Sequence, residues 1–306
     1  MQILTRVAQR PTPHDGEHLA ISPDLVTERR GISLRAHPAS RRAPPIQAAW
    51  RTQHAPEAAR FQVRKVGAPA VSVQGLRAGI FDVDGVLLAS PHERAWREAL
   101  PGFADPNRFT TAMYQAQVAG KPRADGARAA LEALGVPDAE RQSVVYAGRK
   151  QARLEELIHA GAITAFPDAL RFVQAMRTLG WPMAVASSSK NANQMMRPIR
   201  LASGQGLLDA FGANVCGRDL RHGKPDPEIF LLAAKELQVA PEHCFVAEDA
   251  PAGVAAARAG GMAALGVARL EDAALLHAAG ADLVVTSLDD VALDELTHGR
   301  LRGRAA

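Results

Sequence analysis

Short apolar runs bounded by polar turns recur along the chain from about residue 75 onward. The runs are Leu76 to Phe81, Met183 to Ala186, Cys244 to Ala247, Ala263 to Val267 and Leu283 to Val285. Continuous apolar runs of this length are typical of parallel strands that are buried on both faces. Helical stretches separate the runs, so the pattern predicts an α/β fold with a doubly wound, Rossmann-like parallel sheet. Ligands of such sheets bind beyond the carboxyl ends of the strands.

The segment between the first two runs has a helical pattern instead. Arg94 to Leu100 opens it, Gly126 to Leu134 is rich in alanine, and Leu154 to Ile158 continues it. The segment is too long for a plain crossover between two strands. We therefore expect an inserted α-helical cap lobe at residues 92–165, over an α/β core made of residues 76–91 and 166–306. A lobe at the strand ends can close on a substrate and exclude water.

Residues 1–75 differ from the rest in composition. They hold 8 of the 20 prolines, with 11 basic and 5 acidic side chains, and show no periodicity. This predicts a disordered, basic tail, and a basic arm that touches an acidic partner is the alternative. The remaining residues carry 25 basic and 27 acidic side chains, so the pI of 9.4 reflects the tail. Without a basic excess on the folded part, we expect no nucleic-acid partner.

Two further features of the sequence indicate the cellular compartment of the protein. No apolar run reaches the roughly 18 residues that a membrane span requires, and the N-terminus lacks a secretory signal pattern. The two cysteines, Cys216 and Cys244, are too few for a disulfide framework and form no Cys-x-x-Cys pair. We therefore expect a cytoplasmic protein with no membrane partner, and we expect it to be a monomer.

Acidic pairs follow two of the predicted strands. Asp82 and Asp84 end the first strand, and Gly85 permits a sharp turn there. Glu248 and Asp249 end the Cys244 to Ala247 strand. Carboxylates this close need a cation between them or a shared proton, and carboxylate oxygens are the ligands that Mg²⁺ prefers. Each acid taken singly is as typical of a turn or a helix cap as it is of a functional site.

A serine-rich segment and a lysine turn follow other strands. Ser187, Ser188, Ser189 and Lys190 come directly after the Met183 to Ala186 strand, where hydroxyl and backbone N–H donors can bind an anion. Lys224 lies in a proline-stiffened turn before a predicted helix and can neutralise a phosphate oxygen. A lysine alone is usually a solvated surface charge, but here all four segments lie at strand-to-helix transitions.

These four segments resemble the four signature motifs of the haloacid dehalogenase superfamily of phosphatases and phosphomutases, over residues 76–290. The resemblance implies a haloacid dehalogenase core with a helical cap. It also implies that Asp82 is the nucleophile, which forms an aspartyl-phosphate, and that Asp84 moves protons to and from the reacting oxygens.

The same resemblance implies a cofactor and a phosphate clamp. Mg²⁺ would be held by the Asp82 carboxylate, the Asp84 main-chain carbonyl and Asp249, with Glu248 nearby. Ser187 and Lys224 would hold the transferring phosphoryl oxygens.

The predicted cap adds a resemblance to the β-phosphoglucomutase-like subgroup. Val118 to Gly126, which includes Gly120, looks like the segment whose arginine grips the non-reacting phosphate of the substrate, and Arg123 would be that arginine. Lys150 matches a second cap contact. His92 stands at a family histidine position, where it would orient Asp84 or gate closure, or simply begin a helix.

Two positions depart from the family pattern near the predicted hinges. The loop before His92 reads Ala89-Ser90 and is two residues shorter than usual. Asp168 replaces a common glycine after Phe166-Pro167, and we expect it to cap a helix.

Three functions stay open from the sequence. The leading one is β-phosphoglucomutase-like isomerisation of a sugar phosphate. The alternative is hydrolysis of a small phosphomonoester such as a sugar phosphate or phosphoglycolate, and the remote one is a non-catalytic binding protein. The expected partner is in each case a phosphorylated small molecule.

Overall fold

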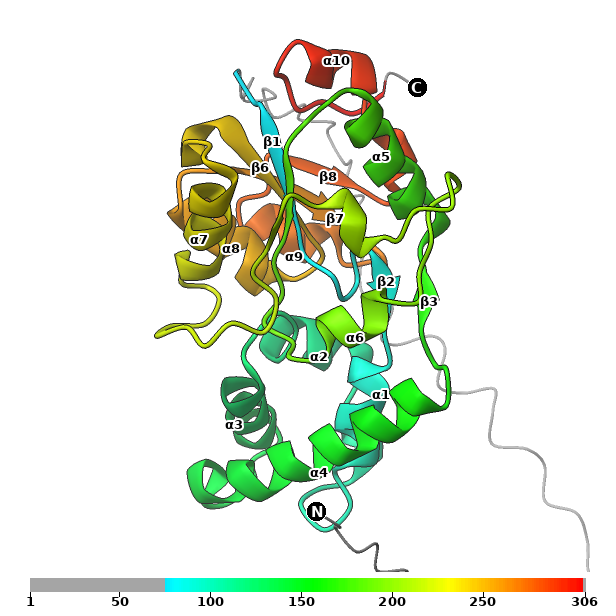
Figure 1. The fold of residues 1–306 in the computed structure, drawn as a ribbon. Coiled ribbons are helices and arrows are strands. Elements are labelled where there is room, and N and C mark those ends of the chain that lie inside the picture. Colours follow the sequence, from blue (N-terminus) through cyan, green and yellow to red (C-terminus); the bar gives the residue numbers. More distant parts are fainter. Residues whose placement is uncertain (1–74, 305–306) are drawn as a thin grey trace, which may run out of the picture. The chain divides into compact units, whose positions relative to one another are not determined.

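The computed structural model describes residues 75–304, and its centre is a six-stranded parallel sheet with the strand order β5-β4-β1-β6-β7-β8 (Figure 1). The strands are β1 (Ala78–Phe81), β4 (Met183–Val185), β5 (Ala213–Asn214), β6 (Cys244–Glu248), β7 (Ala263–Val267) and β8 (Leu283–Val285). The predicted α/β fold with a parallel sheet is confirmed. The predicted tail, residues 1–75, lies outside the described residues apart from Gly75.

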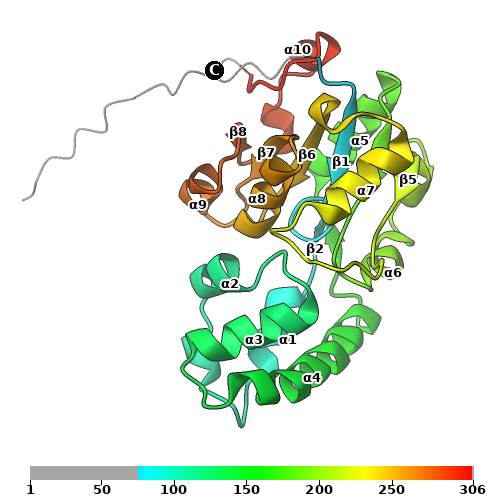
Figure 2. The same cartoon turned by 90° about the vertical axis from the view of Figure 1, so that its left-hand side faces the viewer.

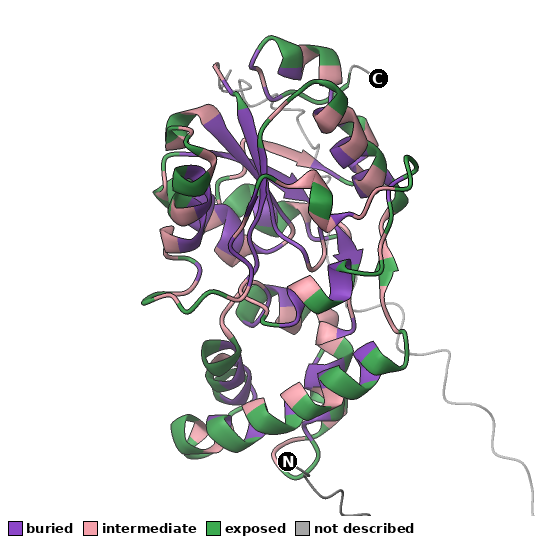
Figure 3. Cartoon of the chain, viewed as in Figure 1, coloured by how far each residue is buried: buried purple, intermediate pink, exposed green. Residues whose placement is uncertain are grey.

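Helices cover both faces of this sheet (Figure 2). Successive strand side chains point to opposite faces, so in β6 Phe245 and Cys244 belong to different core clusters. Burial on both faces explains why the strands read as continuous apolar runs: β1, β4, β6 and β7 are buried along their whole length, whereas the edge strands β5 and β8 are partly exposed (Figure 3). The helices of the core are α5 (Pro167–Thr178), α6 (Ala192–Met196), α7 (Glu228–Leu237), α8 (Pro251–Ala259), α9 (Ala273–Ala278) and α10 (Leu293–Thr297).

Aromatic rings on one face of the sheet fix the strand that precedes Asp82. The Phe81 ring meets Phe172, Phe211 and Phe245 edge to face, with centroids 6.0, 5.9 and 5.9 Å apart. Gly79 leaves room for this cluster, because a Cβ there would lie 2.8 Å from the Phe245 ring. Truncating a buried phenylalanine typically costs about 3–5 kcal/mol, so β1 is held firmly.

Four helices form a second lobe with its own core. They are α1 (His92–Glu98), α2 (Thr111–Gln117), α3 (Arg123–Ala133) and α4 (Ala139–His159). Apolar residues of these helices form a separate cluster, in which the buried Tyr146 hydroxyl donates to the Trp96 carbonyl at 2.8 Å. Two short antiparallel strands, β2 (Leu88–Ala89) and β3 (Thr164–Ala165), connect this lobe to the sheet. The two connections therefore run side by side.

Short 3₁₀ turns complete the described secondary structure. They are η1 (Pro106–Arg108), η2 (Leu208–Ala210), η3 (Pro241–His243) and η4 (Leu288–Asp290). Within residues 75–304, no helix has the length and apolar character needed to cross a membrane.

Candidate active site

The carboxyl ends of two neighbouring strands bring the predicted nucleophile to a buried lysine. Asp82 follows β1 and Glu248 ends β6, and these strands pair in register through Phe81 and Ala247. Lys224 Nζ donates to Asp82 Oδ1 at 2.6 Å and also to Glu248 Oε1. All three side chains are buried. The lysine is therefore a part of the acid cluster and does not lie on the surface.

The turn at Gly85 brings the other two acids into the same cluster. Gly85 has a φ of +83°, a conformation that other residues rarely adopt. The Asp249 carboxylate lies directly against it, because a Cβ on Gly85 would stand 1.9 Å from Asp249 Oδ2. Glycine is thus required both by the turn and by the close approach of Asp249 to the loop that carries Asp84.

The cluster holds more negative charge than its lysine neutralises. Burial raises the pKa of Asp82, Asp84 and Asp249, and it raises that of Glu248 to about 7. Repulsion between carboxylates adds to the effect at Asp82, Glu248 and Asp249. Burial opposes the charge on Lys224, but Asp82 and Glu248 outweigh it and raise the pKa of the lysine. Asp84 Oδ1 is buried without a hydrogen-bond partner among the described residues. These carboxyl oxygens fit a hard divalent cation.

The serine-rich segment lies beside Asp84 and touches the cap. The buried Ser187 hydroxyl lies 3.5 Å from Asp84 Oδ2 and accepts from the Ser189 N–H at 3.1 Å. Ser188 Oγ donates to the carbonyl of Gly120, in the segment between α2 and α3, at 3.3 Å. Lys190 is not brought to the acids, because its ammonium group pairs with the exposed Asp219 at 2.6 Å.

A chain of polar contacts joins the cap to Asp84. Lys150 Nζ lies 2.9 Å from His92 Nδ1, and His92 Nε2 lies 3.3 Å from Ser189 Oγ and 3.6 Å from Asp84 Oδ1. Burial, reinforced by Lys150, lowers the pKa of His92 well below its usual value, so the imidazole is neutral. Nδ1 therefore accepts from Lys150, and Nε2 carries the proton that faces Ser189 and Asp84.

Burial also alters Lys150 itself. It lowers the pKa of Lys150 to about 7, with Arg123 adding to the shift and Asp84 opposing it. The ammonium group lies 4.8 Å from the centroid of the Trp96 ring. This lysine can therefore gain or lose a proton near neutral pH, depending on what binds beside it.

Most of these groups line a cavity of about 930 Å³ between the core and the cap. Asp82, Asp84, Ser187 and Asp249 line it from the core. Gly120, Arg123 and Lys150 line it from the cap, and Arg123 is exposed at the first residue of α3. The volume suits a phosphorylated small molecule.

Motif reasoning did not select two other lining residues, Tyr114 and Arg269. Burial and then the nearby carboxylate of Asp249 raise the pKa of the Tyr114 hydroxyl well above its usual value. Neither residue belongs to a motif, so no local signal in the sequence identifies them. The expectation for Asp168 is wrong: its carboxylate does not cap α5 and instead accepts from Arg269 and from residues after β8.

Comparisons with known proteins agree with this geometry. Residues 76–261 match the model of the haloacid dehalogenase-like hydrolase family. The β-phosphoglucomutase of Mycobacterium tuberculosis is 34% identical, over 79% of this chain and 98% of the relative. A phosphorylated carbohydrates phosphatase of Thermotoga maritima is 32% identical, over 69% of this chain and 94% of the relative.

Solved structures show the same likeness. An archaeal β-phosphoglucomutase from Pyrococcus superposes with a TM-score of 0.57 at 30% identity, covering 72% of this chain and 96% of that one. The chain is therefore an enzyme of the mutase or phosphatase kind, and it belongs to the haloacid dehalogenase-like hydrolases, in their β-phosphoglucomutase-like subgroup.

Proposed function

We propose that this enzyme isomerises a sugar phosphate as a β-phosphoglucomutase-like phosphomutase, through a phosphoryl group carried on Asp82. The observation that carries the proposal is the shared cavity. Asp82 lines one side of it, and Arg123 and Lys150 line the cap side, so a reacting phosphate and a second phosphate can be bound at once. A mutase needs both positions, because its intermediate is a bisphosphate.

In the first half-reaction the Asp82 carboxylate attacks a phosphorus atom of the sugar bisphosphate. The bond between phosphorus and the leaving oxygen breaks, and Asp84 donates a proton to that oxygen. In the second half-reaction a sugar hydroxyl attacks the aspartyl-phosphate, Asp84 takes the proton from this hydroxyl, and Asp82 is released as a carboxylate. The raised pKa of Asp84 supports this role, because a carboxyl group must carry the proton before it donates it.

Other core residues bind the transferring group. Lys224 supplies a fixed positive charge beside Asp82, and Ser187 donates from the neighbouring strand end. Ser188 and Ser189 complete the proposed phosphate-binding segment, whereas Lys190, predicted to belong to it, pairs with Asp219 away from the acids. Both carboxylate oxygens of Glu248 are already engaged, one by Lys224 and one by the Ala250 N–H, which supports a role in holding the lysine.

The proposed cofactor is Mg²⁺. Asp82, the Asp84 carbonyl and Asp249 would hold it, with Glu248 behind them, and when bound it supplies positive charge to the phosphoryl oxygens. The excess of buried carboxylates, with Asp249 packed against the glycine that follows Asp84, supports this assignment.

We also propose how the rest of the chain serves this site. Residues 92–165 act as the cap that covers the sugar, over a core of residues 76–91 and 166–306. A monomer suffices, because every residue of the proposed site comes from one chain. Both cysteines are free and buried, which agrees with work in the reducing cytoplasm.

Hydrolysis of a small phosphomonoester is the second candidate. The phosphatase relative from Thermotoga maritima favours it, because water can replace the sugar hydroxyl in the second half-reaction without any change in the core. One assay separates the two. Purified protein is given β-glucose 1-phosphate with a trace of bisphosphate, beside a panel of phosphomonoesters. We expect isomer to form faster than inorganic phosphate, and phosphate release without isomer would refute the mutase assignment.

A further inference from the structure

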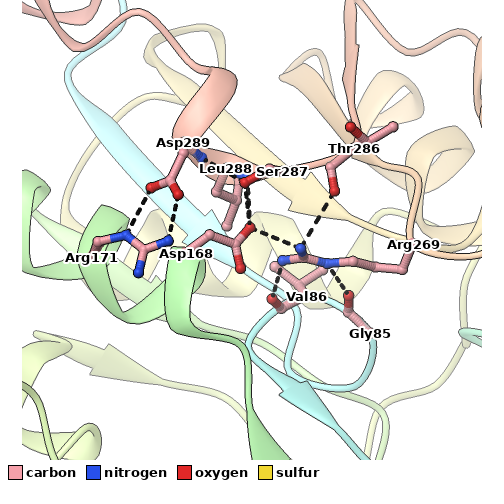
Figure 4. Close-up of polar contacts among 9 residues, drawn as sticks. All are labelled: Gly85, Val86, Asp168, Arg171, Arg269, Thr286, Ser287, Leu288 and Asp289. Carbon is pink, nitrogen blue, oxygen red and sulfur yellow. Dashed lines mark hydrogen bonds and ion pairs between the residues drawn. The ribbon is translucent and has the colours of Figure 1, made fainter.

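The guanidinium group of Arg269, just after β7, lies at the meeting point of four segments (Figure 4). Nη1 donates to Asp168 Oδ2 at 2.8 Å and to the Thr286 carbonyl at 3.5 Å. Nε and Nη2 donate to the carbonyls of Gly85 and Val86 at 3.4 and 3.3 Å. The side chain is only 13% exposed. Its N–H donors thus form hydrogen bonds within the protein.

Asp168 anchors this arginine to the core. Its Oδ2 also accepts from the Leu288 N–H at 2.7 Å and from the Ser287 hydroxyl at 3.1 Å. Burial raises the pKa of Asp168, but its hydrogen bonds outweigh burial and hold the pKa below the usual value. The carboxylate therefore stays charged, and it holds the guanidinium by a charge-assisted hydrogen bond.

The two carbonyls that Arg269 binds belong to the loop that carries the proposed nucleophile and proton carrier. Gly85 follows Asp84 directly, and Asp249 packs on the same glycine. The guanidinium carbon also lies 4.1 Å from the centroid of the Phe166 ring, at the return from the cap into α5. Arg269 therefore touches both the catalytic loop and the second connection between cap and core.

We propose that Arg269, held by Asp168, is a positioning residue: it sets the Gly85–Val86 turn, and through it the orientation of Asp84 and Asp82 toward the reacting phosphate. The inference rests on the proposed function. Arg269 lines the cavity, but its donors bond to Asp168 and to backbone carbonyls. Its loss should therefore spare substrate binding and slow the chemical step.

Arg269→Ala tests this against a matched control. Arg171 forms a two-pronged pair with Asp289 in the same neighbourhood, but among the described residues it contacts no part of the catalytic loop (Figure 4). We expect Arg269→Ala to lower kcat by about ten- to a hundredfold with little change in KM, since small misplacements of reacting groups have effects of this size. Arg171→Ala should keep the wild-type kcat.

Two further readouts separate positioning from general stability. Guanidinium ion, at concentrations far below those that unfold the protein, should restore part of the kcat of Arg269→Ala and none in other variants. Amide hydrogen exchange should speed up in residues 82–91 of Arg269→Ala and stay unchanged there in Arg171→Ala. If Arg269→Ala does not fold, Arg269→Lys keeps the pair with Asp168 but cannot hold both carbonyls, and it should show the same loss of kcat.

The outcomes distinguish this inference from the proposed function. A wild-type enzyme that transfers no phosphoryl group refutes the proposed function. An active wild type with unchanged kcat in Arg269→Lys and Arg269→Ala refutes the positioning role alone. Equal losses of kcat in Arg269→Ala and Arg171→Ala, without guanidinium rescue, also refute it.

Discussion

Buried charges determine what single residues can do in this site. Lys224 lies between Asp82 and Glu248, and Lys150 lies against His92 and Trp96. Removing one member of a buried pair leaves the other uncompensated, at a cost of about 3–5 kcal/mol. Substitutions at Lys224 therefore disturb folding and chemistry together. Substitutions on the cap side of the cavity are better suited to separate effects on folding from effects on chemistry.

Arg123→Ala should reduce isomerisation much more than hydrolysis of para-nitrophenyl phosphate. The proposed reason is that Arg123 binds the second phosphate, which the simple ester lacks. Losing such a charge-assisted contact costs about 1.5–3 kcal/mol, or on the order of ten- to a hundredfold in binding. Arg128→Ala is the control, because Arg128 lies on the same helix but pairs with Asp125 and its neighbours on the surface. Equal loss of both activities in Arg123→Ala would instead indicate a role in the cap fold.

The pKa of Lys150, about 7 in the free enzyme, predicts a pH dependence of substrate binding. A bound phosphate stabilises the charged amine, so binding takes up a proton once the free lysine is neutral. KM should therefore be flat below pH 7 and rise above it, approaching about tenfold per pH unit. Lys150→Met should bind more weakly but lose this rise. The prediction fails if KM of both proteins follows the same pH profile.

At the scale of elements, the cap segment between α2 and α3 contacts the core closely. Ser188 donates to the Gly120 carbonyl, and a Cβ on Gly120 would lie 3.0 Å from Ala250. A Cβ on Gly223, next to Lys224, would lie 1.9 Å from Pro122 Cγ. Such contacts leave no room for an added methyl group.

Gly223→Ala should therefore hold the cap away from the core and lower kcat/KM by about tenfold, as expected when reacting groups are displaced. Pro122→Ala removes the obstructing ring, so the double variant should regain most of the loss. Steady-state kinetics of both single variants and the double variant check this. Additive losses, with no recovery in the double variant, would show that the contact between Gly223 and Pro122 does not control how closely the cap approaches the core.

The core strands were predictable because burial on both faces leaves continuous apolar runs, and β7 and β8 have the predicted bounds. β5 was missed because it has only two residues, Ala213–Asn214, at the edge of the sheet. In the cap, Leu154 to Ile158 proved to be the end of the 21-residue α4, whose mostly polar surface hides its periodicity. Arg269 could not be found at all, since its partners Gly85 and Asp168 are distant in the sequence.

For the whole molecule, the core and the cap have separate tasks in the proposed mechanism. The acids, the serine segment and Lys224 all follow strands of the sheet or precede its helices, and they support phosphoryl transfer whatever the acceptor. The cap helices supply Arg123, Lys150 and His92, which line the cavity opposite the proposed nucleophile. Mutase and phosphatase relatives at similar identity agree with a shared core reaction and a choice of acceptor made by the cap.

The central claim is that Asp82 carries the phosphoryl group. Enzyme mixed with Mg²⁺ and sugar bisphosphate, quenched in acid within one turnover, should gain the mass of one phosphoryl group. Peptide mass spectrometry should locate it on Asp82, and hydroxylamine should remove it, as expected for an acyl phosphate. Asp82→Asn, which is nearly isosteric but not a nucleophile, should gain no such mass and should not turn over. A phosphoryl group elsewhere, or turnover by a cleanly prepared Asp82→Asn protein, would contradict the mechanism.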